Sequence, residues 1–159
     1  MWKFGWKMPC VLLSLLLLSP VLEAADPDQP YNEKADAKEM ISRAYAGAAA
    51  REKPVMIVFG ANWCPDCRAL DKAMHEPDIQ DLVERYFQLV KVDVGNWDKN
   101  LDIVAEYDNP IQGGIPSLVV TDIDRKILFM TKGGQLASAR SMGHDTLLKF
   151  FQTLSRLQP

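Results

Sequence analysis

Residues 55–67 read VMIVFGANWCPDC, a pattern that predicts a buried strand, a short loop and the first turn of a helix. Val55–Phe59 is an unbroken apolar run, which is typical of a strand covered on both faces. Pro65 stands where the first helical residue is expected, and proline is favoured there because that position needs no backbone N–H. The segment therefore places two cysteines, Cys64 and Cys67, at the start of a helix.

The predicted helix start indicates that Cys64 is reactive. The backbone N–H groups of Asp66 and Cys67 have no partner inside the helix, and they lie at the positive end of its dipole. Both effects stabilise a thiolate at Cys64, and the thiolate is the nucleophilic form of cysteine. Cys67 follows on the same side of the first turn. We expect Cys64 to form a mixed disulfide with a substrate and Cys67 to displace that substrate.

Asp66 indicates whether the cysteine pair reduces or oxidises its substrates. The Asp66 carboxylate opposes ionisation of Cys64 because like charges repel. A less stabilised thiolate makes a more reducing couple, so the sequence favours a protein-disulfide reductase, nearer ~ −270 mV than ~ −120 mV. Two alternatives stay open: an oxidase or isomerase, and a non-catalytic binding module whose cysteines hold a metal or remain locked.

Other uses of a closely spaced cysteine pair fit the chain less well. Haem attachment needs a histidine after the second cysteine, where this chain has Arg68. A structural zinc site needs four ligands, and only His75 and His144 remain to join the pair. A purely structural disulfide would close too small a ring to constrain the unfolded chain much. We therefore predict a redox-active Cys64–Cys67 pair, with no metal and no organic cofactor.

The flanking sequence alternates between helical and extended patterns. Helices are predicted over residues 33–51, 64–74, 78–86, 97–107 and 146–157, and strands over 55–59, 87–94, 118–121 and 127–131. Because strands first alternate with helices and then form a hairpin, we expect an α/β fold with a central mixed sheet flanked by helices. Trp97 is interpreted as a packing residue at a helix start. Two long loops, 109–114 and 133–143, would narrow substrate choice if they flank the site.

The N-terminus has the pattern of a signal peptide. Lys3 and Lys7 precede a short apolar run, Val11–Leu18, and small residues follow at Ala24 and Ala25. The apolar stretch is shorter than the ~20 residues of a spanning helix, so an uncleaved membrane anchor is the weaker alternative.

Three segments are therefore predicted: a signal peptide over 1–24, cleaved after residue 24 or 25, a flexible leader over 25–32 and one domain over 33–159. Cleavage would remove Cys10, so that Cys64 and Cys67 are the two cysteines left in the exported protein. The cleaved protein is expected to have no stable membrane insertion. We expect a bacterial protein of the periplasm, a compartment that permits disulfides. The whole chain has 159 residues and a net charge of −3 without basic runs, which suits one domain and excludes nucleic-acid binding by bulk charge.

The chain resembles the thioredoxin superfamily over residues 53–157. The resemblance rests on the strand Val55–Phe59, the Trp63–Cys67 motif, Lys91-Val92-Asp93, and Gly114-Ile115-Pro116 before the next strand. The preceding helix and residues 53–56 are similar to the periplasmic thioredoxin-like domain of the bacterial membrane thiol reductase. The resemblance implies a thioredoxin-like fold with an extra N-terminal helix. As partners it implies proteins that carry disulfides or thiols, and a membrane thiol reductase as electron donor.

The resemblance also implies roles for single residues. Pro116 matches the family's cis-proline, which faces the cysteines, and the backbone of Ile115 would pair with an extended substrate. Trp63 matches the tryptophan that packs beside the motif. Lys91 matches a lysine near the buried cysteine.

One position departs from the family pattern. Many thioredoxins carry a buried acid six residues before the first cysteine, which is thought to help deprotonate the second cysteine, and this chain has Val58 there. Either Asp66 or a water held by Lys91 would then assist Cys67, or the step is slower. The sequence does not choose between these alternatives.

Overall fold

The computed structural model describes residues 29–157. The predicted signal peptide, with Cys10, and residues 25–28 of the predicted leader lie outside this range. Within it, no helix is both long and apolar enough to cross a membrane.

The described residues contain a mixed sheet of four strands in the order β2-β1-β3-β4. The strands are Val55–Gly60 (β1), Gln88–Asp93 (β2), Ser117–Thr121 (β3) and Ile127–Met130 (β4). β1 pairs in parallel with β2 and antiparallel with β3, and β3 and β4 form an antiparallel hairpin. All of β1 is buried, which explains its unbroken apolar run, and the predicted mixed sheet is confirmed.

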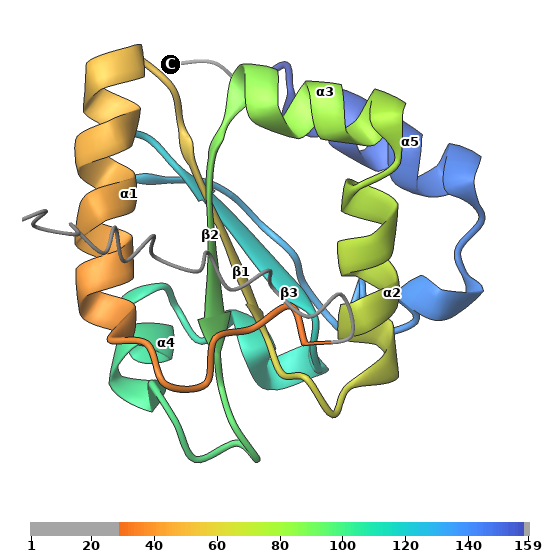
Figure 1. Cartoon of the computed structure of the whole chain (residues 1–159), viewed down its shortest axis with the longest axis horizontal. Coiled ribbons are helices and arrows are strands. Elements are labelled where there is room, and N and C mark those ends of the chain that lie inside the picture. The colour runs from red at the N-terminus through yellow and green to blue at the C-terminus, as the bar shows by residue number, and fades with distance from the viewer. Residues whose placement is uncertain (1–28, 158–159) are drawn as a thin grey trace, which may run out of the picture.

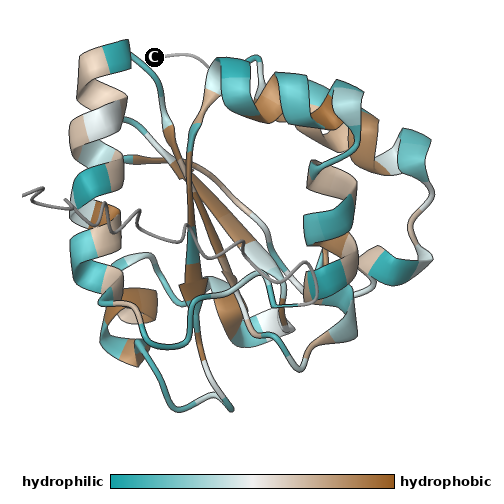
Figure 2. Cartoon of the chain, in the orientation of Figure 1, coloured by the Kyte–Doolittle hydropathy of each residue, from teal (hydrophilic) through white to brown (hydrophobic). Residues whose placement is uncertain are grey.

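Helices cover both faces of this sheet (Figure 1). On one face lie α1 (Ala37–Arg51) and α4 (Leu101–Glu106), and on the other lie α2 (Pro65–Met74), α3 (Pro77–Tyr86) and α5 (His144–Leu154). Alternate residues of β1 supply the two cores: Ile57 and Phe59 face the α1 side, and Met56 and Val58 face the α2 side. Figure 2 shows the apolar strands enclosed by helices that carry hydrophilic residues on their outer sides.

The helix predicted over 97–107 is shorter than expected and begins at Leu101. Trp97 and Asn100 have φ values of 66° and 55°, and this left-handed conformation cannot continue into an α-helix. Trp97 is also 44% exposed, so its interpretation as a packing residue at a helix start is wrong. The first helix begins at Ala37 rather than at residue 33, because Asp36 caps it by accepting the Glu39 N–H at 3.1 Å.

The end of the predicted flexible leader is anchored to the domain. Tyr31 is 3% exposed, and Asn62 binds its backbone twice: the Tyr31 N–H donates to Oδ1, and Nδ2 donates to the Tyr31 carbonyl, both at 2.9 Å. In Figure 1 the chain from residue 29 to α1 crosses the carboxyl end of β2. The prediction of flexibility therefore fails at Tyr31, because a buried ring and two buried hydrogen bonds fix its position.

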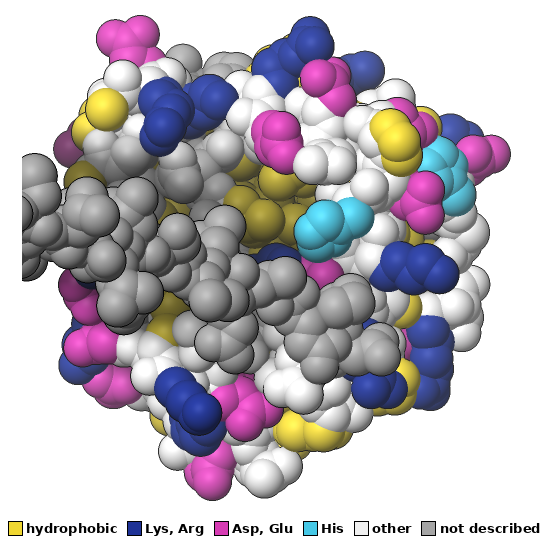
Figure 3. Space-filling view, in the orientation of Figure 1, with side chains coloured by type: hydrophobic (Ala, Val, Ile, Leu, Met, Phe, Trp, Pro, Cys, Tyr) yellow, Lys and Arg dark blue, Asp and Glu magenta, His cyan; other side chains and the backbone are white. Residues whose placement is uncertain are grey.

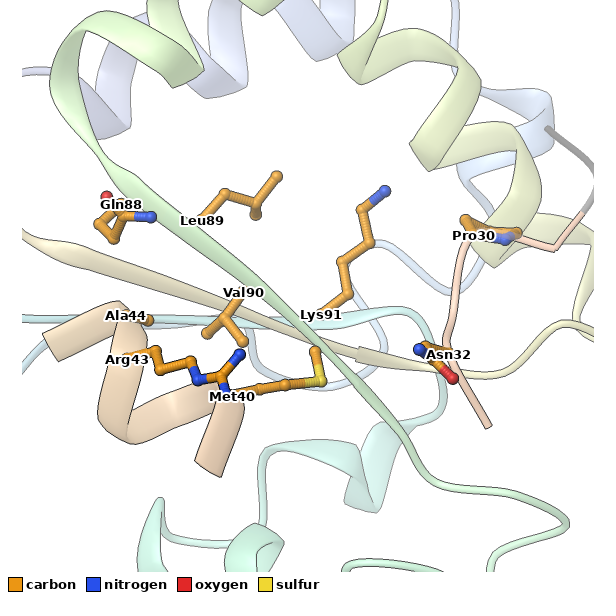
Figure 4. A pocket seen from close by; sticks show the side chains of 9 residues that line it. All are labelled: Pro30, Asn32, Met40, Arg43, Ala44, Gln88, Leu89, Val90 and Lys91. Atoms are coloured by element: carbon orange, nitrogen blue, oxygen red, sulfur yellow. The ribbon is translucent and has the colours of Figure 1, made fainter. Parts of the chain in front are cut away.

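A groove of about 390 Å³ follows the free edge of β2 (Figure 4). It is lined by Gln88–Lys91 of β2, by Met40, Arg43 and Ala44 of α1, and by Pro30 and Asn32 on either side of Tyr31. Neither motif cysteine lines this groove. The chemistry predicted from the sequence lies elsewhere, at the carboxyl end of β1.

Candidate active site

The cysteine motif lies where the chain leaves β1 and enters α2. Cys64 is the N-cap of α2, and its sulfur accepts a hydrogen bond from the N–H of Cys67 at 3.2 Å. Pro65 is the first helical residue, as predicted. Both described cysteines are free thiols; Cys64 keeps 4% of its surface exposed and Cys67 keeps 0%. Of the two sulfurs, Cys64 is therefore the one that a second molecule can approach.

The two sulfurs hold their protons very differently. The pKa of Cys64 is lowered to about 7, mainly by the hydrogen bond with the Cys67 side chain. Burial of Cys64 acts in the opposite direction and raises this pKa. The backbone N–H groups of Cys67 and Asp66 lower this pKa further, whereas the Asp66 carboxylate raises it. The pKa of Cys67 is raised far above its usual range, first by its hydrogen bond with Cys64 and then by burial. Near neutral pH the pair therefore carries its negative charge on Cys64 and its proton on Cys67.

Asp66 ties the start of α2 to the loop 133–143. Its carboxylate accepts the backbone N–H of Arg140 at 3.0 Å, and the Arg140 guanidinium lies 3.7 Å away. Arg140 belongs to the short 3-10 helix Ala139–Ser141, which packs against α2. The loop therefore flanks the motif, and Arg140 offsets part of the negative charge that Asp66 places near Cys64.

The chain before β3 approaches Cys64 from the other side. The Ile115–Pro116 peptide bond is cis, and the Ile115 carbonyl oxygen accepts the Cys64 thiol at 3.5 Å. Gly114 has a φ of 118°, a conformation that side-chain-bearing residues rarely adopt. The structure thus brings the Ile115-Pro116 backbone beside Cys64, where the sequence resemblance implied it.

Known proteins share this fold and part of this sequence. Residues 36–122 match the thioredoxin-like family. The chain belongs to that family. It is 45% identical to a solved disulphide isomerase from Xylella fastidiosa Temecula1, over 79% of this chain and 96% of that chain, with a TM-score of 0.77.

Two more distant structures share the thioredoxin-like fold. The DsbD C-terminal domain of Neisseria meningitidis is 20% identical over 75% of this chain and 96% of its own, with a TM-score of 0.54. A thioredoxin from Thermus thermophilus is 21% identical over 71% of this chain and 82% of its own, with a TM-score of 0.53.

Next to Cys64, this thioredoxin-like protein exposes two tryptophans. Trp63 is 50% exposed, and its Nε1–H donates to the Gly95 carbonyl at 2.8 Å. Its ring centroid lies 6.2 Å from that of Trp97, which is 44% exposed. The sequence predicts Trp63 as a site residue but not Trp97, because the two tryptophans stand on loops that are far apart in the chain. Together they form an aromatic surface beside the motif.

Lys91 forms an ion pair with Asp71, an acid that the sequence alone does not single out. Its ammonium group pairs closely with the carboxylate of Asp71, which follows Cys67 by one turn of α2. Only 20% of the Lys91 side chain and 9% of the Asp71 side chain is exposed, so the ion pair is largely buried. The spacing of four residues between Cys67 and Asp71 is the signal in the sequence, since residues so spaced share one face of a helix.

The surroundings of the two sulfurs differ from those in many thioredoxins at one position. Val58 is 1% exposed among apolar residues on the α2 side, so the acid that many thioredoxins carry at this position is replaced by a hydrocarbon. Among residues 29–157, no group of three or more His, Cys, Asp and Glu side chains is placed to hold a metal ion. On the face drawn in Figure 3, acidic and basic side chains are interspersed without forming one large patch of either sign.

Proposed function

We propose that this protein is a thiol–disulfide oxidoreductase that reduces disulfide bonds of other proteins in the periplasm. The observation that carries the proposal is the position of the Cys64 sulfur at the N-terminus of α2, with its pKa lowered to about 7. About half of such thiols are ionised at pH 7, against roughly 3% for a cysteine with the usual pKa of ~8.5. The 45% identity to a disulphide isomerase supports the same class of chemistry.

The proposed exchange has two steps. The Cys64 thiolate attacks a substrate disulfide, the bond from Cys64 to the substrate forms, the substrate S–S bond breaks, and the released thiolate takes up a proton. Cys67 then attacks Cys64, the Cys64–Cys67 bond forms, the bond to the substrate breaks, and the proton of Cys67 ends on the departing sulfur. The substrate gains two electrons and two protons, and the protein is left as the disulfide.

The pKa of Cys64 favours the reducing direction. Stabilising the thiolate stabilises the reduced protein, so a strong oxidant has an attacking cysteine with a pKa of ~3.5, whereas that of thioredoxin is ~7. Cys64 has the higher of these two values. The charge of Asp66 acts in the same direction, because it raises the pKa of Cys64.

The proposed substrates are proteins that present an extended segment beside Cys64. The Ile115 carbonyl, 3.5 Å from the Cys64 sulfur, would pair with the substrate backbone, and Trp63 and Trp97 would contact its apolar side chains. An exported reductase lies outside the reach of cytosolic nicotinamide-dependent reductases, so its disulfide needs another source of electrons. We propose a membrane thiol reductase as that donor.

Disulfide isomerisation is the second candidate, and the Xylella relative favours it. An isomerase attacks a wrong disulfide with Cys64 and leaves after the substrate has rearranged, without net electron transfer. Recovery of activity by a ribonuclease with scrambled disulfides measures this function. A reductase accelerates insulin reduction by dithiothreitol and leaves the ribonuclease recovery unchanged.

A Cys67→Ser variant is expected to trap the substrates on Cys64. It keeps the nucleophile at the helix start but lacks the sulfur for the second step, so mixed disulfides accumulate. Complexes isolated from the cell envelope without reductant and identified by mass spectrometry provide the measurement. The Cys64→Ser/Cys67→Ser double variant is the matched control and should capture no protein. A folded Cys67→Ser variant that also captures none would contradict the proposed function.

A further inference from the structure

The second step of the proposed exchange needs negative charge on a fully buried sulfur. Cys67 is 0% exposed, and burial disfavours the charged form of any thiol. Asp66 is already bound to Arg140, and Lys91 to Asp71. The two groups that the sequence offered as helpers of Cys67 therefore have other partners.

The hydroxyl group of Tyr31 lies near the Cys67 sulfur. A Cβ placed on Gly60 would lie 2.3 Å from the Tyr31 hydroxyl oxygen and 2.9 Å from the Cys67 sulfur, so the two atoms converge over this glycine. Because both atoms lie within 3 Å of this one point, the Tyr31 hydroxyl faces the Cys67 sulfur across the space over Gly60. Glycine at position 60 leaves the room in which they meet.

The position of Tyr31 is fixed independently of the cysteines. Asn62, two residues before Cys64, binds the Tyr31 N–H and carbonyl at 2.9 Å each and also donates to Glu33 Oε1 at 2.9 Å. Figure 4 shows Pro30 and Asn32, which flank Tyr31, on the segment that passes β2. The hydroxyl is thus placed by the same loop that leads into the motif.

The Tyr31 hydroxyl acts as a donor throughout the pH range of the exchange. Burial, and then the nearby Cys67, Asp71 and Cys64, raise the pKa of Tyr31 well above its usual value. The hydroxyl therefore keeps its proton. A hydrogen bond donated to an anionic sulfur is stronger than one donated to a neutral thiol, so Tyr31 favours the thiolate of Cys67.

We propose that Tyr31 is a catalytic residue of the resolving step and that the segment before α1 is part of the active site. Its hydroxyl donates to the Cys67 sulfur as that sulfur attacks Cys64. The Cys64–Cys67 bond forms, the Cys64–substrate bond breaks, and the proton of Cys67 ends on the departing substrate sulfur, while Tyr31 keeps its own proton. This inference rests on the proposed thiol–disulfide exchange.

A Tyr31→Phe variant tests the inference, because it removes one oxygen and keeps the ring. Reduced protein, with Cys10→Ser in every variant, is mixed rapidly with 5,5′-dithiobis(2-nitrobenzoate). Attack by Cys64 releases a first coloured thiolate at a rate set by reagent concentration, and attack by Cys67 releases a second at a rate independent of it. Tyr31→Phe is expected to leave the first phase unchanged and to slow the second about tenfold or more at pH 7, since one hydrogen bond to a charged group is lost.

The dependence of the second-phase rate on pH separates loss of the hydroxyl from loss of packing, because a packing defect would not shift this dependence. This rate follows the thiolate of Cys67, whose pKa Tyr31 lowers, so the rate in Tyr31→Phe should keep rising to higher pH than in the parent. The other ionisable groups around this sulfur and hydroxyl, Cys64 and the Asp71–Lys91 pair, are the same in both proteins.

Two further variants complete the test. Tyr107→Phe deletes another buried tyrosine hydroxyl, which lies 3.3 Å from that of Tyr45, and both phases should match the parent. Asn62→Ala keeps the Tyr31 hydroxyl but releases its backbone, and the second phase should slow. A Tyr31→Phe second phase equal to that of the parent, after a normal first phase, overturns the inference. A parent protein without the first phase overturns the proposed function instead.

Discussion

A Cys64→Ser variant is expected to reduce insulin no faster than dithiothreitol alone. A serine hydroxyl is not ionised near neutral pH and forms no disulfide, so the first step of the exchange is lost. The fold should persist, because serine is a preferred N-cap and its oxygen can accept the Cys67 N–H that the Cys64 sulfur accepts at 3.2 Å. Turbidity of the precipitating insulin B chain measures activity, and thermal unfolding followed by circular dichroism measures stability.

The Cys67→Ser variant is the matched control for this loss. It carries the same sulfur-to-oxygen change on the neighbouring cysteine but should still form a mixed disulfide through Cys64. Insulin reduction above background by a folded Cys64→Ser variant would show that the chemistry lies at another site.

A Phe59→Ala variant is expected to lower the free energy of unfolding by about 3–5 kcal/mol. Phe59 lies in the central strand β1, is fully buried, and its ring centroid is 6.0 Å from that of Tyr107. Truncation removes the buried ring and leaves a cavity between β1 and the α4 side of the fold, which close-packed neighbours fill only in part. Equilibrium unfolding in urea gives the measurement.

Phe129→Ala supplies the comparison for that loss. Phe129 lies on the edge strand β4 and is only partly buried, so the same truncation should have a clearly smaller effect. Equal losses at the two positions would contradict the assignment of β1 as the centre of the core.

Local sequence patterns predict most of this fold. Val55–Phe59 identifies the central strand, because a strand with neighbours on both sides and helices on both faces buries every side chain. Pro65 identifies the start of α2, and the helix start in turn predicts the hydrogen bond to the Cys64 sulfur. The neighbourhood of Pro116 follows from the family resemblance and not from the residues themselves.

Contacts between distant segments are not predictable from such patterns. Tyr31 stands in a short segment with a proline and polar residues, and its place depends on the space over Gly60 and on Asn62. Trp97 is exposed, and its backbone is left-handed, a conformation that no periodicity signals and that bulky residues seldom adopt. In the sequence, Asp71 is marked only by its spacing of four residues from Cys67. Its ion pair with Lys91 depends on the fold, which brings β2 and α2 together.

The reactivity of Cys64 as a function of pH tests the central claim most directly. The reduced protein is treated with iodoacetamide at a series of pH values, and the modification of each cysteine is followed by mass spectrometry of its peptide. The rate at Cys64 should rise with a midpoint at about pH 7, while Cys67, which is fully buried, remains unmodified. A midpoint at the ordinary cysteine value of ~8.5 would contradict the account, because the start of α2 would then confer no special reactivity on this sulfur.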